Sequence, residues 1–201
     1  MACNTATAMT LEIVKEELDI PVIGVILPGA SSAIQKTKTN KIGVIATQAS
    51  IRSDEYHKTI ARKSSAIEVL SLACPKFVSI VESNEMESEI AKRVVSESLA
   101  PLVGKIDTLI LGCTHYPLLR SLIQETMGKE VRLIDSGAEA VRDISVLLNY
   151  FEINAHERKE YQHCFYTTAG VNSFREIAEK WLNIGHLHIE HAEIENFNKE
   201  K

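Results

Sequence analysis

Short apolar segments alternate with amphipathic segments along almost the whole chain. The apolar segments end at small or polar residues, which is typical of buried strands, and the segments between them repeat apolar residues at helical spacing. Strands are predicted at residues 22–26, 42–46, 67–73, 108–111, 131–135, 163–168 and 187–190. Helices are predicted at residues 5–18, 30–36, 85–103, 117–127, 138–150 and 173–182, with one more through Tyr56 and Ile60.

The regular alternation of strands and helices predicts an α/β protein with one parallel sheet, or two, and right-handed crossovers. A weak internal echo supports this pattern. The tetrapeptide Ile-Gly-Val-Ile occurs at residues 23–26 and again at residues 42–45, each time before a turn and a predicted helix. The polar run at residues 154–162 reads as a solvated linker.

In parallel sheets of this kind, ligands bind beyond the carboxyl ends of the strands. The stretch Leu111-Gly-Cys-Thr-His-Tyr-Pro117 shows how a strand can present a reactive side chain there, because a thiol directly follows the apolar run. The polar residues predicted at these strand ends are Cys3, Asn4, Thr5, Thr47, Ser50, Cys74, Glu82, Cys113, Thr114, His115, Asp135 and Ser136.

Composition narrows the class of protein. The 201 residues are 45% hydrophobic and 24% charged with a formal net charge of −5, which fits a soluble globular protein and offers no basic field for nucleic acid. No apolar run is long enough to span a bilayer, and the N-terminus lacks the pattern of a signal peptide. We therefore expect a cytoplasmic protein, with no membrane partner and with reduced cysteines.

Several cofactor and metal sites have no support in the sequence. The four cysteines form no C-x-x-C pair, so we expect no metal site. The chain also contains neither a Walker-type phosphate loop nor a G-x-G-x-x-G motif, so nucleotide binding is not expected. The predicted chemistry requires no cofactor.

Two cysteines share a local context, Cys3-Asn-Thr5 and Cys113-Thr114. A thiol has a pKa near 8.5, so both its protonated and its ionised forms are accessible near neutral pH. On opposite sides of a carbon acid, one thiolate can remove a proton while the other thiol returns one from behind. Such a pair inverts the carbon without a metal, and His115 could move the proton of Cys113 on and off.

Other interpretations of these residues stay open. A cysteine is commonly a small buried apolar residue, and this is the simplest interpretation of Cys74 and Cys164. A Cys–His pair such as Cys113 and His115 also occurs in hydrolases as nucleophile and base. Glu82 could be a solvated carboxylate at a helix end. The remaining histidines lie in polar settings and are interpreted as surface residues: His57, His156, His163, His186, His188 and His191.

Two motifs together resemble glutamate racemase, in the aspartate/glutamate racemase superfamily. They are Ala2-Cys-Asn-Thr-Ala-Thr-Ala8 and Leu111-Gly-Cys-Thr-His-Tyr-Pro-Leu-Leu119, with Ala73-Cys-Pro-Lys-Phe-Val-Ser-Ile-Val-Glu82 between them. The likeness runs from residue 2 to about residue 182. Further matches are Pro28-Gly-Ala30, residues 42–47, and Ser53 with Tyr56.

The resemblance implies a cofactor-independent enzyme that interconverts L- and D-glutamate and supplies D-glutamate for bacterial peptidoglycan. It implies that Cys3 handles the α-proton of D-glutamate and Cys113 that of L-glutamate, with His115 and Glu82 assisting Cys113. The residues that it implies for substrate binding are Asn4, Thr5, Thr47, Ser50 and Thr114. Family members pair in different ways, so a homodimer is compatible with the resemblance.

The resemblance also implies two doubly wound parallel-sheet domains related by pseudo-two-fold symmetry. On this basis residues 1–24 and 136–201 are expected to belong to a first, incomplete domain, and residues 25–135 to the second. Family members carry a segment with an Asp-Ser-Gly loop before the first cysteine, whereas Cys3 is the third residue here. The sequence therefore predicts a truncated racemase with impaired activity. The alternatives are an inactive amino-acid-binding module of the same fold and a racemase for aspartate.

Overall fold

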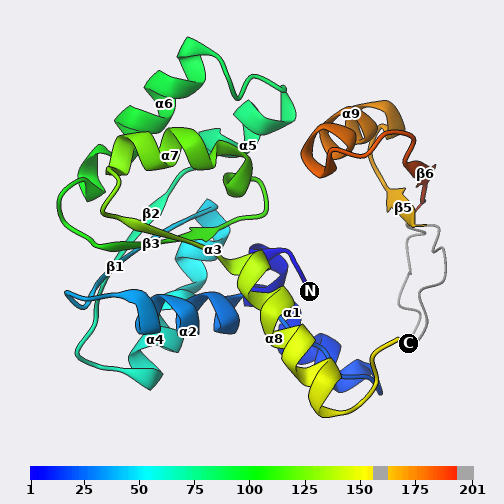
Figure 1. Cartoon of the computed structure of the whole chain (residues 1–201), viewed down its shortest axis with the longest axis horizontal. Helices are drawn as coiled ribbons and strands as arrows, with labels where there is room; N and C mark the ends of the chain where they lie inside the picture. Colours follow the sequence, from blue (N-terminus) through cyan, green and yellow to red (C-terminus); the bar gives the residue numbers. More distant parts are fainter. Residues whose placement is uncertain (156–162, 194–201) are drawn as a thin grey trace, which may run out of the picture. The chain divides into compact units, whose positions relative to one another are not determined.

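The computed structural model describes residues 1–155 and 163–193 (Figure 1). By its internal contacts the chain divides into two compact units, Met1–Asn154 and Ala155–Lys201. The domain boundaries expected near residues 24 and 135 divide the chain differently and stay a prediction. Most of the expected linker, residues 156–162, lies outside the described residues.

Within the described residues, the first unit contains a four-stranded sheet, and the second a two-stranded sheet with one helix. The strands of the first unit are β1 (Lys41–Ala46), β2 (Glu68–Ala73), β3 (Thr108–Gly112) and β4 (Arg132–Asp135). Its helices are α1 (Asn4–Glu17), α2 (Ile26–Lys36), α3 (Gln48–Ser53), α4 (Glu55–Lys63), α5 (Lys76–Glu82), α6 (Glu89–Leu99), α7 (Arg120–Met127) and α8 (Ser136–Tyr150), with the 3₁₀ turns η1 (Ala100–Leu102) and η2 (Tyr116–Leu119). The second unit has β5 (Cys164–Thr167), α9 (Val171–Leu182) and β6 (His188–His191). None of the helices in the described ranges is both long and apolar enough to cross a membrane.

The larger sheet is parallel throughout and has the strand order β2-β1-β3-β4. This confirms the predicted α/β class with a parallel sheet. The strand order reverses between β1 and β3, because β2 continues on one side of β1 while β3 and β4 continue on the other. The carboxyl ends of these two central strands therefore lie where doubly wound folds bind their ligands.

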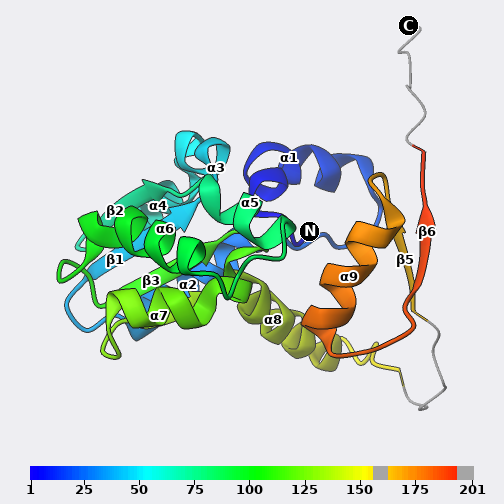
Figure 2. The same ribbon diagram turned by 90° about the horizontal axis from the view of Figure 1, so that it is seen from above.

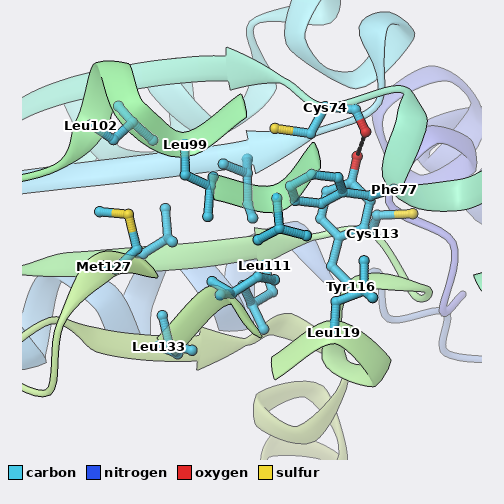
Figure 3. Packing of buried hydrophobic residues seen from close by; sticks show 14 of the residues in the cluster. Cys74, Phe77, Leu99, Leu102, Leu111, Cys113, Tyr116, Leu119, Met127 and Leu133 are labelled. Atoms are coloured by element: carbon cyan, nitrogen blue, oxygen red, sulfur yellow. Dashed lines mark hydrogen bonds between the residues drawn. The ribbon is translucent and has the colours of Figure 1, made fainter. Parts of the chain in front are cut away.

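Helices cover the sheet on both faces, as Figure 1 shows with α6 and α7 on one side and α2 and α4 on the other. The buried apolar residues form two clusters, one on each face of the sheet, because successive side chains of a strand point to opposite faces. In β1, Ile45 points into one cluster, whereas Ile42 and Val44 point into the other. The larger cluster joins β3 to α5, α6, α7 and η2, and ten of its residues are labelled in Figure 3. Strands buried on both faces need near-continuous apolar runs, which is what the sequence provides.

The predicted strand at residues 22–26 is wrong. Residues 22–24 are irregular, and Ile26 begins helix α2, which therefore starts four residues before the predicted helix at 30–36. None of the sheets in the described residues includes this segment. Its backbone packs against α1 instead, so closely that a Cβ added at Gly24 would lie 2.4 Å from the Thr7 side chain. Met1 also donates a hydrogen bond from its terminal amine to Ile23 O at 2.6 Å.

Asp107 closes the loop between α2 and β1. Its carboxylate accepts hydrogen bonds from Thr37 Oγ1 at 2.7 Å, from Lys38 N at 2.6 Å and from Thr39 N at 2.7 Å. Partial burial acts to raise the pKa of Asp107, but these hydrogen bonds to the ionised form outweigh it and lower the pKa to about 2. The carboxylate therefore stabilises the loop only while it is ionised.

The lowered pKa of Asp107 predicts a specific dependence of stability on pH. The contribution of Asp107 is fully present above its unfolded pKa, about 3.9, and is lost as pH falls toward the folded pKa. In Asp107→Asn, the free energy of unfolding should be lower at pH 6 and should fall less than in the wild type between pH 4 and pH 2. Urea unfolding of both proteins at pH 6 and between pH 4 and pH 2 measures these free energies. Parallel profiles for the two proteins would contradict the prediction.

Candidate active site

Cys113 directly follows β3 and stands at the carboxyl edge of the sheet, beside the end of β1. Its position depends on Gly112, which has no room for a side chain. A Cβ at Gly112 would lie 2.8 Å from Ile45 O and 3.1 Å from the ring of Tyr56. The absence of a side chain at Gly112 therefore allows β1 and the Tyr56 ring of α4 to pack closely against the end of β3, next to the thiol. Cys113 is 8% exposed and is therefore largely buried.

A chain of polar contacts leads from the sulfur of Cys113 to a carboxylate. Cys113 Sγ lies 3.7 Å from His115 Nδ1, and His115 Nε2 lies 3.3 Å from Glu82 Oε1. Thr114 Oγ1 also lies 3.4 Å from His115 Nδ1. The side chain of His115 is 31% exposed and that of Glu82 is 62% exposed, so the chain runs outward from the buried thiol. This is the geometry of a group that can pass a proton between a thiol and solvent.

The surroundings of Cys113 act on its pKa in both directions. Burial is the largest effect and raises the pKa, the N–H group of His115 lowers it in part, and the negative charge of Cys3 raises it further. The net result is a pKa above that of an ordinary thiol.

Cys3 stands at the start of helix α1. Its sulfur accepts a hydrogen bond from Ala6 N at 3.5 Å, so the thiol caps one of the N–H groups that the first turn leaves unpaired. Cys3 is exposed, in contrast to Cys113. The two cysteines that share a sequence context therefore occupy different settings, one at a helix start and one at a strand end.

A cluster of three hydroxyl groups ties α1 to the end of β1. Thr5 Oγ1 lies 2.9 Å from both Thr47 Oγ1 and Ser50 Oγ, and Thr47 Oγ1 donates to Ser50 Oγ at 3.1 Å. Thr47 also caps helix α3 by accepting from Ser50 N. These three residues were all predicted to bind substrate, and the fold brings them together. Hydroxyl groups can donate to a carboxylate, so the cluster is compatible with that role.

Asn4 lies in a buried network rather than facing solvent. It is 2% exposed, it accepts a hydrogen bond from Tyr56 Oη at 2.6 Å, and its amide donates to Ser136 Oγ at 3.3 Å. Ser136 Oγ also lies 3.3 Å from Leu111 O in β3. The network thus fixes the helix that carries Cys3 to the strand that leads to Cys113.

Sequence reasoning did not assign Tyr56 to the site. It occupies a helix with ordinary apolar spacing, and no pattern indicates that its hydroxyl group reaches Asn4 across the fold. Ser136 carried a weak signal, because it follows a predicted strand. Burial raises the pKa of Tyr56 strongly, so this phenol is a protonated donor near neutral pH.

Removing the hydroxyl group of Tyr56 should destabilise the protein. Tyr56→Phe leaves the buried Asn4 oxygen without its shortest hydrogen bond, which is expected to lower the free energy of unfolding by about 1–3 kcal/mol. Urea unfolding measures this change. Tyr150→Phe makes the same chemical change at a residue that is 79% exposed and should have almost no effect. Equal stability of the two variants would show that the network is not formed.

A buried aromatic pair supports the segment that carries His115. The rings of Phe77 and Tyr116 pack edge to face, with centroids 5.2 Å apart at an interplanar angle of 67°. Tyr116 Oη donates a hydrogen bond to Cys74 O at 2.9 Å, drawn as a dashed line in Figure 3. The pair joins η2, directly after His115, to α5, which ends at Glu82. Burial raises the pKa of the Cys74 thiol to about 12, so Cys74 stays protonated.

Comparison with known proteins decides the family. The model of the Asp/Glu/Hydantoin racemase family matches residues 1–144. A glutamate racemase of Lactococcus lactis subsp. cremoris is 98% identical over all 201 residues, which cover 74% of its length. The chain belongs to the Asp/Glu/Hydantoin racemase family.

Solved structures of racemases agree with this assignment. A glutamate racemase of Bacillus anthracis matches with a TM-score of 0.90 at 42% identity, over 96% of this chain and 72% of its own. A glutamate racemase of Francisella tularensis, solved in complex with D-glutamate, matches with a TM-score of 0.87 at 35% identity, over 97% of this chain and 73% of its own. The sequence-based recognition of a racemase is therefore confirmed.

Proposed function

We propose that this chain binds glutamate and interconverts its L- and D-forms. The observation that carries the proposal is the buried network of Tyr56, Asn4 and Ser136, which ties the helix that begins after Cys3 to the strand that leads to Cys113. The 98% identical relative is named a glutamate racemase, which supports glutamate as the substrate. The product D-glutamate would enter bacterial peptidoglycan, in the cytoplasm, where thiols stay reduced.

In the proposed reaction each thiol serves one face of the α-carbon. The Cys113 thiolate takes the α-proton of L-glutamate, the electron pair stays on the substrate as a carbanion, and the Cys3 thiol donates a proton from the opposite face to give D-glutamate. The reverse reaction exchanges the two roles. Protons taken and given are equal in number, so no oxidant, metal or cofactor is needed.

The remaining site residues have supporting roles in this proposal. His115 lies 3.7 Å from the sulfur of Cys113 and would remove the thiol proton before the reaction, while Glu82 holds the opposite ring nitrogen and stabilises the protonated imidazole. Such help is needed because Cys113 has a raised pKa. The Thr5–Thr47–Ser50 cluster and Thr114 would donate hydrogen bonds to the carboxylates of the substrate. Asn4 would hold the start of α1 in place through its hydrogen bonds to Tyr56 and Ser136, and its side-chain amide would also contact the substrate.

Circular dichroism of glutamate tests the proposal. Incubation of the chain with D-glutamate, and separately with L-glutamate, should drive both samples to the same zero signal. In D₂O the product should carry deuterium at the α-carbon, because the returning proton comes from a thiol that exchanges with solvent. The proposal fails if neither inversion nor α-deuterium is found.

Thermal unfolding with glutamate, and the same racemisation assay with aspartate, separate the other interpretations. Thermal stabilisation by glutamate without α-deuterium would indicate an amino-acid-binding module. Faster inversion of aspartate than of glutamate would indicate an aspartate racemase. Comparing the rate with that of the longer Lactococcus lactis relative tests the prediction of impaired activity.

A further inference from the structure

Three potential metal ligands gather on one face of the small sheet in the second unit. Strands β5 and β6 run parallel, and their register pairs Cys164 with His188 and Tyr166 with Glu190. Ile189, between the two outward residues of β6, is 8% exposed. Alternation along the strands therefore places Cys164, Tyr166, His188 and Glu190 together on the exposed face.

The ligand atoms of three of these residues already lie close to one another. The sulfur of Cys164, a ring nitrogen of His188 and a carboxylate oxygen of Glu190 all lie within 4.8 Å of one another. His188 Nε2 and Glu190 Oε1 are only 2.8 Å apart. Around a tetrahedral zinc ion, with bonds of about 2.0–2.3 Å, neighbouring ligand atoms are about 3.5 Å apart. Small side-chain rotations would close the cluster around one ion.

Chemistry narrows the choice of ion. A thiolate, an imidazole and a carboxylate are the three side-chain types that bind zinc, whereas calcium and magnesium prefer oxygen ligands alone. We propose that Cys164, His188 and Glu190 form a binding site for a thiophilic divalent cation of the zinc class. Three protein ligands leave a fourth position open to water.

The strand geometry selects one histidine from a histidine-rich tract. The sequence His186-Leu-His-Ile-Glu-His191 contains three histidines. His186 lies before β6 with a φ of 64°, and His191 Nδ1 lies 3.3 Å from Ala169 O, so neither belongs to the cluster. Of the three, only His188 stands opposite Cys164 in the sheet register.

Cobalt(II), a spectroscopic substitute for zinc, tests the site in the whole chain under reducing conditions. The wild type should bind one equivalent with a thiolate-to-cobalt charge-transfer band, and added zinc should remove the band. Cys164→Ser should abolish the band, and His188→Gln and Glu190→Gln should each raise the dissociation constant by about tenfold or more. His57→Gln, which changes an exposed histidine of α4, should bind as the wild type does.

Two further measurements make the result decisive. Far-ultraviolet circular dichroism of the metal-free variants checks that each is folded, which is expected because all three substituted residues are exposed. Zinc should raise the thermal unfolding midpoint of the wild type but not that of Cys164→Ser. The proposal is overturned if no charge-transfer band forms, or if the band and the affinity persist in Cys164→Ser, since Cys3 and Cys113 would then be the thiolate ligands.

Discussion

Replacing Cys113 with alanine is expected to lower the rate of glutamate racemisation by about 10²–10⁴-fold, the usual contribution of one acid–base group. Cys113 directly follows the central strand β3, and its sulfur contacts His115. In the proposed mechanism, loss of this thiol leaves one face of the α-carbon without a base and without a proton donor. Racemisation followed by circular dichroism, from each enantiomer in turn, measures the loss.

Cys74→Ala is the matched control for this variant. It removes a second buried thiol at the same edge of the sheet, after strand β2. The pKa of Cys74 is raised to about 12, so this thiol does not ionise near neutral pH and should not serve as a base. The rate of Cys74→Ala should stay close to that of the wild type. If Cys113→Ala retains the wild-type rate, the two-thiol mechanism is wrong.

Cys113→Ala should also separate proton exchange from inversion. Cys3 remains in this variant and, in the proposed mechanism, serves the α-proton of D-glutamate. In D₂O, D-glutamate should therefore gain α-deuterium with retention of configuration, while L-glutamate should gain almost none. Proton nuclear magnetic resonance of the recovered amino acid measures this. Equal exchange into both enantiomers would contradict the assignment of one thiol to each face.

Replacing Phe77 with alanine is expected to lower the free energy of unfolding by about 3–5 kcal/mol, as is typical of a fully buried aromatic residue. Phe77 is 0% exposed, and its ring packs edge to face on Tyr116 in the larger core cluster (Figure 3). The substitution removes apolar area from the core, leaves a cavity and loses the aromatic contact. Urea unfolding measures the change.

Ile90→Ala is the control for the loss of an apolar side chain. Ile90 lies in α6 and is 56% exposed, so its truncation should cost far less than that of Phe77. Similar losses in the two variants would mean that the cluster around Phe77 is not packed as described. Activity should fall together with stability in Phe77→Ala, because the aromatic pair supports the segments that carry His115 and Glu82.

Figure 2 shows the first unit from above, with α6 and α7 drawn in front of the strands of the sheet. Most of these elements could be predicted from apolar spacing alone. The predicted strands at 42–46, 67–73, 108–111 and 131–135 all form, and Gly128 ends α7 as its position indicated. The central strands β1 and β3 are predictable because they are buried on both faces and must be apolar at nearly every position.

The repeated tetrapeptide Ile-Gly-Val-Ile shows the limit of that prediction. At residues 42–45 it forms the centre of β1, between β2 and β3. At residues 23–26 it is irregular and then enters helix α2. The two copies of the tetrapeptide have the same local preferences, so their different structures come from their neighbours in space. A strand needs partners for its backbone groups, which only the tertiary fold supplies.

By itself the sequence determined the α/β class, the two cysteine motifs and the racemase family, because periodicity and motifs are local properties of the chain. Only the tertiary structure decided how these parts combine. It placed Cys113 at the switch point of the sheet, aligned His115 with Glu82, and buried Asn4 against Tyr56 and Ser136. It also paired Cys164 with His188. Each of these contacts joins residues far apart in sequence, and their distances depend on strand order and packing.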